Sequence, residues 1–200
     1  MSDLYTPSGD PGVDRLAFFH LLERLKTQKR TGWINNHVPD PESISDHMYR
    51  MSVLALCSSD PDLDVSKCTM MCIVHDIAEA QVGDIAPSHG IAKEEKIRLE
   101  TEAMRNIVHD MLHNSSAAQR IEALWQEYEA GETAEAKFVK DLDRIEMALQ
   151  ASEYEKRHDK DLQAFFDSSL PKIRHPEVRD WAEDLERERT AKSISSVDET

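Results

Sequence analysis

The sequence predicts an all-α protein, and two observations support this. Apolar residues recur at intervals of three and four along most of the chain, which is the period of a helix with one buried face. No segment alternates apolar and polar residues for long enough to form a strand. At 200 residues the chain can bury one substantial core. We therefore expect a single helical bundle over 13–190, between a flexible N-terminal tail (1–12) and a disordered C-terminal tail (191–200).

The first half of the chain carries clear helix start and stop signals. The first apolar stripe consists of Leu16, Phe19, Leu22 and Leu25, and Phe18 and Leu21 widen it. Ser43 or Ser45 can cap the next helix, which Asp60-Pro61 ends. The segments around Gly32 and Gly83 contain glycine and proline and predict irregular structure. Helices are expected at 13–27, from Ser43 or Ser45 to about 56, and at 66–80, followed by a loop at 81–91.

The second half predicts five more helices. Gly131 is a typical residue just past a helix C-terminus, and it separates two of them. Phe138, Leu142, Ile145 and Leu149 form one apolar stripe on the longest segment. Pro171 and Pro176 divide the last two. The expected ranges are 92–112, 115–130, 133–157, 161–169 and 176–190.

Composition narrows the classes of function. Asp and Glu number 39 against 24 Lys and Arg, which gives a net charge of −15. Such a surface repels nucleic acids and anionic membranes, so neither is expected as a partner. The sequence contains no apolar run of membrane-spanning length, and its start lacks a signal-peptide pattern. The three cysteines lie in helical apolar patterns, so we expect reduced thiols in a cytoplasmic protein.

Residues 73–84 (IVHDIAEAQVGD) carry the strongest chemical signal. His75 and Asp76 lie near the end of an apolar helix, where burying both without partners would be costly. Glu79 follows at helical spacing and is expected on the same face, and Asp84 lies in the loop beyond. These side chains together indicate a metal site.

Other segments must complete such a site. His47 lies at the start of the preceding helix, and residues 139–143 supply Asp141 and Asp143. Two imidazoles and two carboxylates suit Mn²⁺, Fe²⁺, Co²⁺ or Zn²⁺ better than Ca²⁺.

The order His…His-Asp…Asp resembles the metal signature of the HD-domain superfamily. The surrounding blocks are similar to its 5′-deoxynucleotidase branch, and the similarity covers roughly 13–187. The blocks are KRTGW (29–33), PESISDHMYRM (41–51), VHDIAEAQVGDIAP (74–87), KEEK (93–96), EAKFVKDLD (135–143) and LQASEYE (149–155).

The resemblance implies that His47, His75 and Asp76 are metal ligands. For the fourth ligand it favours Asp143, which follows the aliphatic-Lys pair by three residues. Helical geometry favours Asp141 instead, because Asp141 lies closer to the centre of the apolar stripe. Both aspartates remain candidates at this point.

The resemblance also assigns the remaining site residues. Glu79 and Asp84 are implied as catalytic residues, and both, with the backbone carbonyl of Ile85, as ligands of a second ion such as Mg²⁺. Arg30, Trp33 and Asp84 are implied to bind the substrate, Arg30 at the phosphate and Trp33 at the sugar. Thr31 and Gly32 separate Arg30 from Trp33, whereas these two residues are often adjacent in the family.

The implied function is metal-dependent hydrolysis of deoxyribonucleoside 5′-monophosphates by a homodimer. The alternatives are an HD phosphodiesterase, a nucleoside polyphosphate hydrolase, or a non-catalytic nucleotide-binding module. A polyphosphate substrate would call for more basic residues than Arg30 and Lys29 around the pocket. A binding module would be expected to have lost a ligand or Glu79, and the sequence retains all of them.

Overall fold

A computed structural model describes residues 4–86 and 89–195 of the chain. All regular elements in these ranges are helices, and their only sheet-like feature is an isolated bridge between Lys29 and Ser43. The prediction of an all-α fold is therefore confirmed. None of the helices in the described ranges is long and apolar enough to span a bilayer.

The helices follow one another along the whole described chain. They are α1 (Pro11–Leu21), α2 (Glu23–Thr27), α3 (Thr31–Asn35), α4 (Ile44–Leu56), α5 (Val65–Val74), α6 (Glu79–Val82), α7 (Lys93–Arg105), α8 (Ser116–Ala130), α9 (Ala134–His158), α10 (Gln163–Ser169) and α11 (Pro176–Ser195). A π-helical segment, η2 (Asn106–Met111), continues α7, and a 3-10 turn, η3 (Leu170–Lys172), continues α10. Helix α11 extends past the expected boundary at 190, and residues 196–200 lie outside the described part.

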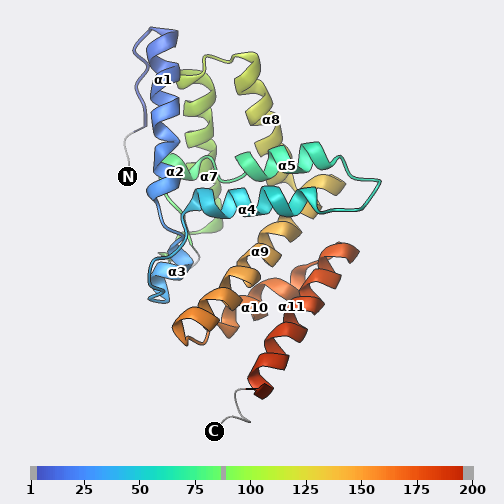
Figure 1. Ribbon diagram of the computed structural model, residues 1–200. Coiled ribbons are helices and arrows are strands. Elements are labelled where there is room, and N and C mark those ends of the chain that lie inside the picture. The colour runs from blue at the N-terminus through green and yellow to red at the C-terminus, as the bar shows by residue number, and fades with distance from the viewer. Residues whose placement is uncertain (1–3, 87–88, 196–200) are drawn as a thin grey trace.

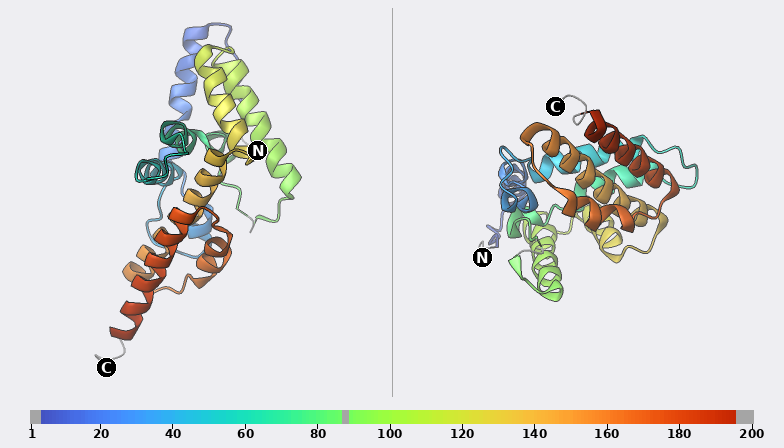
Figure 2. Two further views of the ribbon diagram at one scale, coloured as in Figure 1. Left: turned by 90° about the vertical axis from the view of Figure 1, so that its right-hand side faces the viewer. Right: turned by 90° about the horizontal axis from the view of Figure 1, so that it is seen from below.

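The helices surround two hydrophobic cores. Helices α4 and α5 lie side by side, and α9 contacts both of them together with α8, α10 and α11 (Figure 1). Helices α1, α7 and α8 lie on one side of the α4–α5 pair, and α10 and α11 lie on the other (Figures 1 and 2). The first core is built mainly by α4, α5, α9, α10 and α11, and the second by α1, α6, α7, η2 and α8. Helix α4 contributes to both cores, so its middle lies at the boundary between them.

Two predicted helices are interrupted. The helix expected at 66–80 ends at Val74, and a turn at 75–78 separates it from α6. In this turn the backbone hydrogen bonds span three residues, as from Glu79 N to Asp76 O at 3.0 Å, and so tighten the chain. The expected helix at 13–27 also divides at Leu22. In addition, the segment predicted to be irregular contains α3, which begins at Thr31.

The N-terminal segment packs against the bundle instead of forming the expected flexible tail. Tyr5 N donates to Asn106 Oδ1 at 3.0 Å, and Asn106 Nδ2 donates back to Tyr5 O at 2.8 Å. Ser8 and the Tyr5 hydroxyl donate to the buried carboxylate of Asp14 on α1. Asp10 caps α1 through Gly12 N and Val13 N. Residues 4–10 are therefore held by side-chain contacts that apolar periodicity cannot reveal.

Candidate active site

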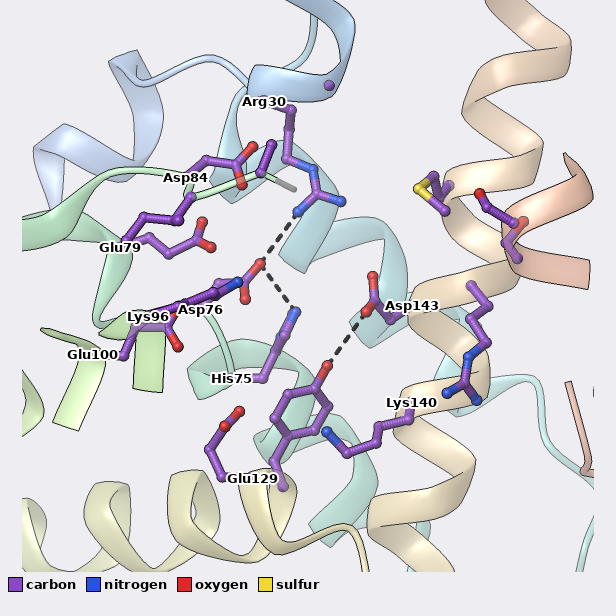
Figure 3. Close-up of a pocket in the computed structure, with 18 of the residues that line it drawn as sticks. Arg30, His75, Asp76, Glu79, Asp84, Lys96, Glu100, Glu129, Lys140 and Asp143 are labelled. Atoms are coloured by element: carbon purple, nitrogen blue, oxygen red, sulfur yellow. Dashed lines mark hydrogen bonds and ion pairs between the residues drawn. The ribbon is translucent and has the colours of Figure 1, made fainter. Parts of the chain in front are cut away.

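Four side chains from three segments converge between the two cores. His47 comes from α4, His75 and Asp76 from the turn after α5, and Asp143 from α9. His47 Nε2 lies 3.4 Å from Asp143 Oδ1 and 3.9 Å from Asp76 Oδ2. His75 Nε2 lies 3.2 Å from the same Asp76 oxygen, and Figure 3 shows His75, Asp76 and Asp143 around a common space. The structure thus brings together the four side chains expected as metal ligands.

Both imidazoles have one nitrogen engaged and the other left for a ligand. His75 Nδ1 contacts the carbonyl of Cys72 at 2.9 Å, and His47 Nδ1 contacts Glu146 Oε2 at 2.5 Å. The buried Nε2 atoms of both rings make no hydrogen bond within the described ranges. A buried polar atom without a partner costs about 1–3 kcal/mol. Two such nitrogens beside two carboxylates fit a divalent transition-metal ion, which would satisfy all four groups.

The structure separates the two candidate aspartates of α9. The ligand atoms of His47, His75 and Asp143 all lie within 4.8 Å of one another. Asp141 is buried and faces away from this group, where its Oδ2 accepts from Arg174 N and His175 N, both at 2.8 Å. Asp141 therefore anchors the start of α11, which begins at Pro176.

Asp76 interacts with the charges of several neighbouring side chains. Arg30, the residue before α3, brings its Nη1 to 3.4 Å from Asp76 Oδ2. Burial raises the pKa of Asp76, but His75 and Arg30 outweigh it and hold that pKa well below its ordinary value. Burial and Arg30 lower the pKa of His47, whereas Glu146 and Asp143 raise it more strongly, to about 10. The carboxylates thus favour positive charge at this point, as a cation site requires.

Glu79 points into the same cavity with a free oxygen. The tight turn at 75–78 places it at the first position of α6, and the residue is only 3 % exposed. Its Oε2 makes no hydrogen bond to any described residue. Burial, followed by the charges of Asp76 and Asp84, raises the pKa of Glu79 well above its ordinary value. A carboxyl group with a raised pKa in a cavity is suited to transferring protons near neutral pH.

Asp84 connects its loop to α3. Its Oδ2 accepts from the backbone nitrogen of Thr31 at 2.6 Å, and its carbonyl accepts from the Thr31 hydroxyl at 2.8 Å. Gly83 has a φ of 80°, which lets the chain turn from α6 into this loop. Asp84 and Ile85 both line the cavity. Asp84 therefore also positions the segment that carries Arg30.

Trp33 lines the cavity but is almost fully buried, with 1 % of its surface exposed. Its Nε1 donates to Glu42 Oε1 at 2.8 Å. The centroid of its ring lies 4.3 Å from the ring centroid of Phe165 and 5.2 Å from that of Tyr154. Burial and the charge of Glu146 raise the pKa of Glu42 to about 7. Trp33 is thus a fixed wall of the cavity as well as part of the core.

The cavity has a volume of about 750 Å³, which suits a small organic ligand. The cavity is also lined by several basic residues that were not predicted as site residues from the sequence: Lys93, Lys96, Lys140, Arg144 and Lys172. Lys140 lies 3.9 Å from the centre of the Tyr128 ring, and the Tyr128 hydroxyl donates to Asp143 at 3.4 Å (Figure 3). Burial raises the pKa of Glu100 to about 7, although its partner Lys96 opposes this. On sequence, Lys96 and Glu100 look like an ordinary exposed helix pair.

Comparison with known proteins agrees with this geometry. The sequence profile of the HD domain matches residues 22–185. This chain belongs to the HD-domain family. It is 45 % identical to human 5'-deoxynucleotidase HDDC2 over 97 % of this chain and 95 % of the relative.

Two further members of the HD-domain family are similar over most of their length. The chain is 45 % identical to 5'-deoxynucleotidase hdd1 of Schizosaccharomyces pombe, covering 87 % of this chain and 89 % of that one. The solved structure of the HD domain-containing protein YGK1 superposes with a TM-score of 0.71 at 31 % identity, covering 92 % and 90 % of the two chains. The resemblance deduced from the sequence motifs is therefore confirmed.

Proposed function

We propose that this protein is a metal-dependent 5′-deoxynucleotidase that hydrolyses deoxyribonucleoside 5′-monophosphates to deoxynucleoside and phosphate. The observation that carries the proposal is the convergence of His47, His75, Asp76 and Asp143 beside Glu79 in one cavity. The names of its HD-domain relatives support the same reaction class.

The residues around the cavity can perform each part of this hydrolysis. A bound divalent ion would supply Lewis-acid charge to the phosphoryl oxygens and lower the pKa of nearby water. Glu79, with its free oxygen and raised pKa, accepts the proton of the attacking water. Arg30 pairs with the phosphate, since its planar guanidinium can make two parallel bonds to phosphoryl oxygens. The oxygen of the attacking water forms a bond to phosphorus as the bond from phosphorus to the 5′-oxygen breaks, and the 5′-oxygen takes a proton from a nearby acid or from water.

The wall formed by Trp33 supports selectivity for deoxyribose. The indole is held by Glu42 and Phe165, so it cannot move aside for a 2′-hydroxyl placed against it. Asp84, which lines the cavity next to α3, is proposed to contact the sugar. Discrimination would then be steric and insensitive to the base.

The test is phosphate release by metal-stripped protein resupplied separately with Mn²⁺, Co²⁺, Zn²⁺, Fe²⁺ and Mg²⁺. Paired deoxyribo- and ribonucleoside 5′-monophosphates serve as substrates, with Glu79→Ala as the inactive control. We expect turnover that a transition-metal ion restores, that favours the deoxy substrate and that disappears in the variant. Absence of phosphate release from every monophosphate with every metal would exclude the nucleotidase.

A nucleoside polyphosphate hydrolase is the second candidate, because the cavity contains the additional basic residues that such a substrate would need. The positive charges of two of these residues are already neutralised in ion pairs, Lys96 with Glu100 and Arg144 with Asp141. We therefore rank this activity below the monophosphatase. Assaying deoxynucleoside triphosphates in parallel decides between them, because a polyphosphate hydrolase would turn them over faster.

A second ion at Glu79, Asp84 and the Ile85 carbonyl is part of the proposal, as all three residues line the cavity. Mg²⁺ is the proposed occupant, because two carboxylates and a carbonyl form a site of oxygen ligands only. Titration with Mg²⁺ after the first ion has bound should reveal one further equivalent. Asp84→Asn should remove that equivalent and leave the first.

A homodimer in the cytoplasm is the proposed state of the protein. Outward-facing apolar residues on the adjacent helices α4 and α5 support an interface: Tyr49, Val53, Leu56, Met70 and Ile73. Cys57, Cys68 and Cys72 are free thiols, in agreement with a reducing compartment. Sedimentation analysis of the wild-type protein and of Val53→Glu tests the interface, with a monomeric variant as the expected result.

A further inference from the structure

The two histidines of the site are supported by different partners. His75 Nδ1 contacts a neutral backbone carbonyl, that of Cys72, at 2.9 Å. His47 Nδ1 contacts the carboxylate of Glu146 at 2.5 Å, and neither side chain in this second pair is exposed. A carboxylate behind an imidazole fixes the ring orientation and makes the opposite nitrogen a stronger metal ligand. The two histidines therefore differ, because a carboxylate contacts His47 on α4 and a neutral carbonyl contacts His75.

Glu146 is held in place by Arg50. Arg50 lies one helical turn after His47 on α4 and donates from Nε to Glu146 Oε1 at 2.7 Å. Its other nitrogens donate to Gln150 at 2.6 Å and to Glu153 at 3.0 Å. The three acceptors follow one another at helical spacing on the face of α9 that meets α4. One carboxylate oxygen of Glu146 therefore contacts His47 and the other contacts Arg50.

We propose that Glu146 is a positioning residue, which holds His47 with Nε2 toward Asp76 and Asp143 and strengthens its bond to the metal ion. This inference rests on the metal site of the proposed function. Glu146 does not touch that site itself, because its contact with His47 is made through Nδ1, on the opposite edge of the ring.

A different role for the same residues is a second ion held by Glu42, His47 and Glu146, whose ligand atoms also lie within 4.8 Å of one another. The hydrogen bonds argue against it. Both oxygens of Glu146 and Nδ1 of His47 are engaged, and Glu42 Oε1 accepts from Trp33. The unpartnered nitrogen of His47 is Nε2, on the side of Asp143.

The test is calorimetric titration of the metal-stripped protein with Mn²⁺ and, separately, Zn²⁺, which requires no substrate. Glu146→Gln keeps an acceptor but removes the charge, and Glu146→Leu removes both. We expect affinity to fall about 10- to 100-fold in Glu146→Gln, and further in Glu146→Leu, with an unchanged number of ions bound. The matched control is Glu153→Gln, which loses only the exposed contact to Arg50 and should bind as the wild type does.

Two further variants keep the result decisive if changes at Glu146 disturb folding, which circular dichroism would reveal. Arg50→Met releases Glu146 from outside the site and should weaken binding less than Glu146→Gln, and Arg50→Lys should recover part of the loss. If the Glu146 variants bind metal as tightly as Glu153→Gln does, the inference is overturned. If the Glu146 variants fail to fold, unchanged metal affinity in Arg50→Met overturns it instead. Loss of one equivalent of metal in Glu146→Gln would also overturn it, because Glu146 would then be a ligand. Failure of the wild-type protein to bind either ion would instead count against the proposed metal site.

Discussion

Thr31 donates its backbone N–H to the carboxylate of Asp84 at 2.6 Å, which ties the loop after α6 to the first turn of α3. The same helix is preceded by Arg30 and contains Trp33, so one carboxylate positions two residues proposed to bind the substrate.

For Asp84→Ala we expect a raised KM, because Arg30 and Trp33 lose their anchor to the loop. The unpaired N–H of Thr31 should lower the free energy of unfolding by about 1–3 kcal/mol. Steady-state kinetics and denaturant titration measure the two effects. Loss of the first equivalent of metal, as determined by elemental analysis, would contradict this role.

For Glu79→Gln we expect kcat to fall about 10²- to 10⁴-fold, since the amide cannot accept the proton of the attacking water. The amide retains the size of the carboxylate and introduces no buried charge, so the thermal midpoint should not decrease. The measurement is steady-state phosphate release at saturating substrate. A variant with undiminished kcat would show that Glu79 is not the base.

Asp143→Asn and Asp141→Asn should have opposite effects. The change at 143 removes a proposed ligand and should abolish tight metal binding with little change in stability of the metal-free protein. The change at 141 should leave metal binding intact and cost about 1–3 kcal/mol of stability, because a buried charged acceptor of Arg174 N, His175 N and Arg144 is lost. Elemental analysis and urea unfolding distinguish the two, and metal loss in Asp141→Asn alone would reverse the assignment.

Asp14 should make stability sensitive to acid. Burial raises its pKa, but hydrogen bonds from Tyr5, Ser8 and His113 outweigh burial and hold the pKa well below its ordinary value. A carboxyl group whose pKa is lower in the folded state stabilises at pH values above its unfolded pKa, which is about 4, and this contribution is lost as the pH falls through the folded pKa. The difference in unfolding free energy between the wild-type protein and Asp14→Asn should therefore be largest at neutral pH and shrink below about pH 4. Urea unfolding at several pH values measures it, and a constant difference would disprove the linkage.

Periodicity predicted the helices well, but on the first helix it did not predict which face is buried. Of the residues expected in the stripe of the first helix, Leu16 and Phe19 are 54 % and 53 % exposed and Phe18 is buried, together with the polar residue Asp14. A polar residue such as Asp14 can be buried when its partners come from elsewhere in the chain, and a single-helix pattern contains no information about them.

The site was predictable where the motif specified it and not elsewhere. His47, His75, Asp76 and Glu79 could be named from the sequence, whereas α9 gave conflicting indications for Asp141 and Asp143. The conflict arose because α9 is buried on several faces, so the centre of one apolar stripe does not point to the cavity. Glu146 carried no motif at all. Its spacing to Gln150 and Glu153, opposite His47 and Arg50, gains meaning only when α4 and α9 are known to be neighbours.

The position of the site at the boundary of two cores has a consequence for cooperativity. His47 is on α4, which contributes Ile44 and Met48 to one core and Met51 to the other, and His75 lies between Cys72 of one core and Ile77 of the other. An ion bound there would cross-link the two halves, so that neither could melt without releasing it. Because such an ion binds the folded chain only, free metal at 100 times its Kd would raise the free energy of unfolding by about 2.7 kcal/mol. Metal supply would thereby govern how long the protein persists in a cell, independently of how fast it turns over substrate.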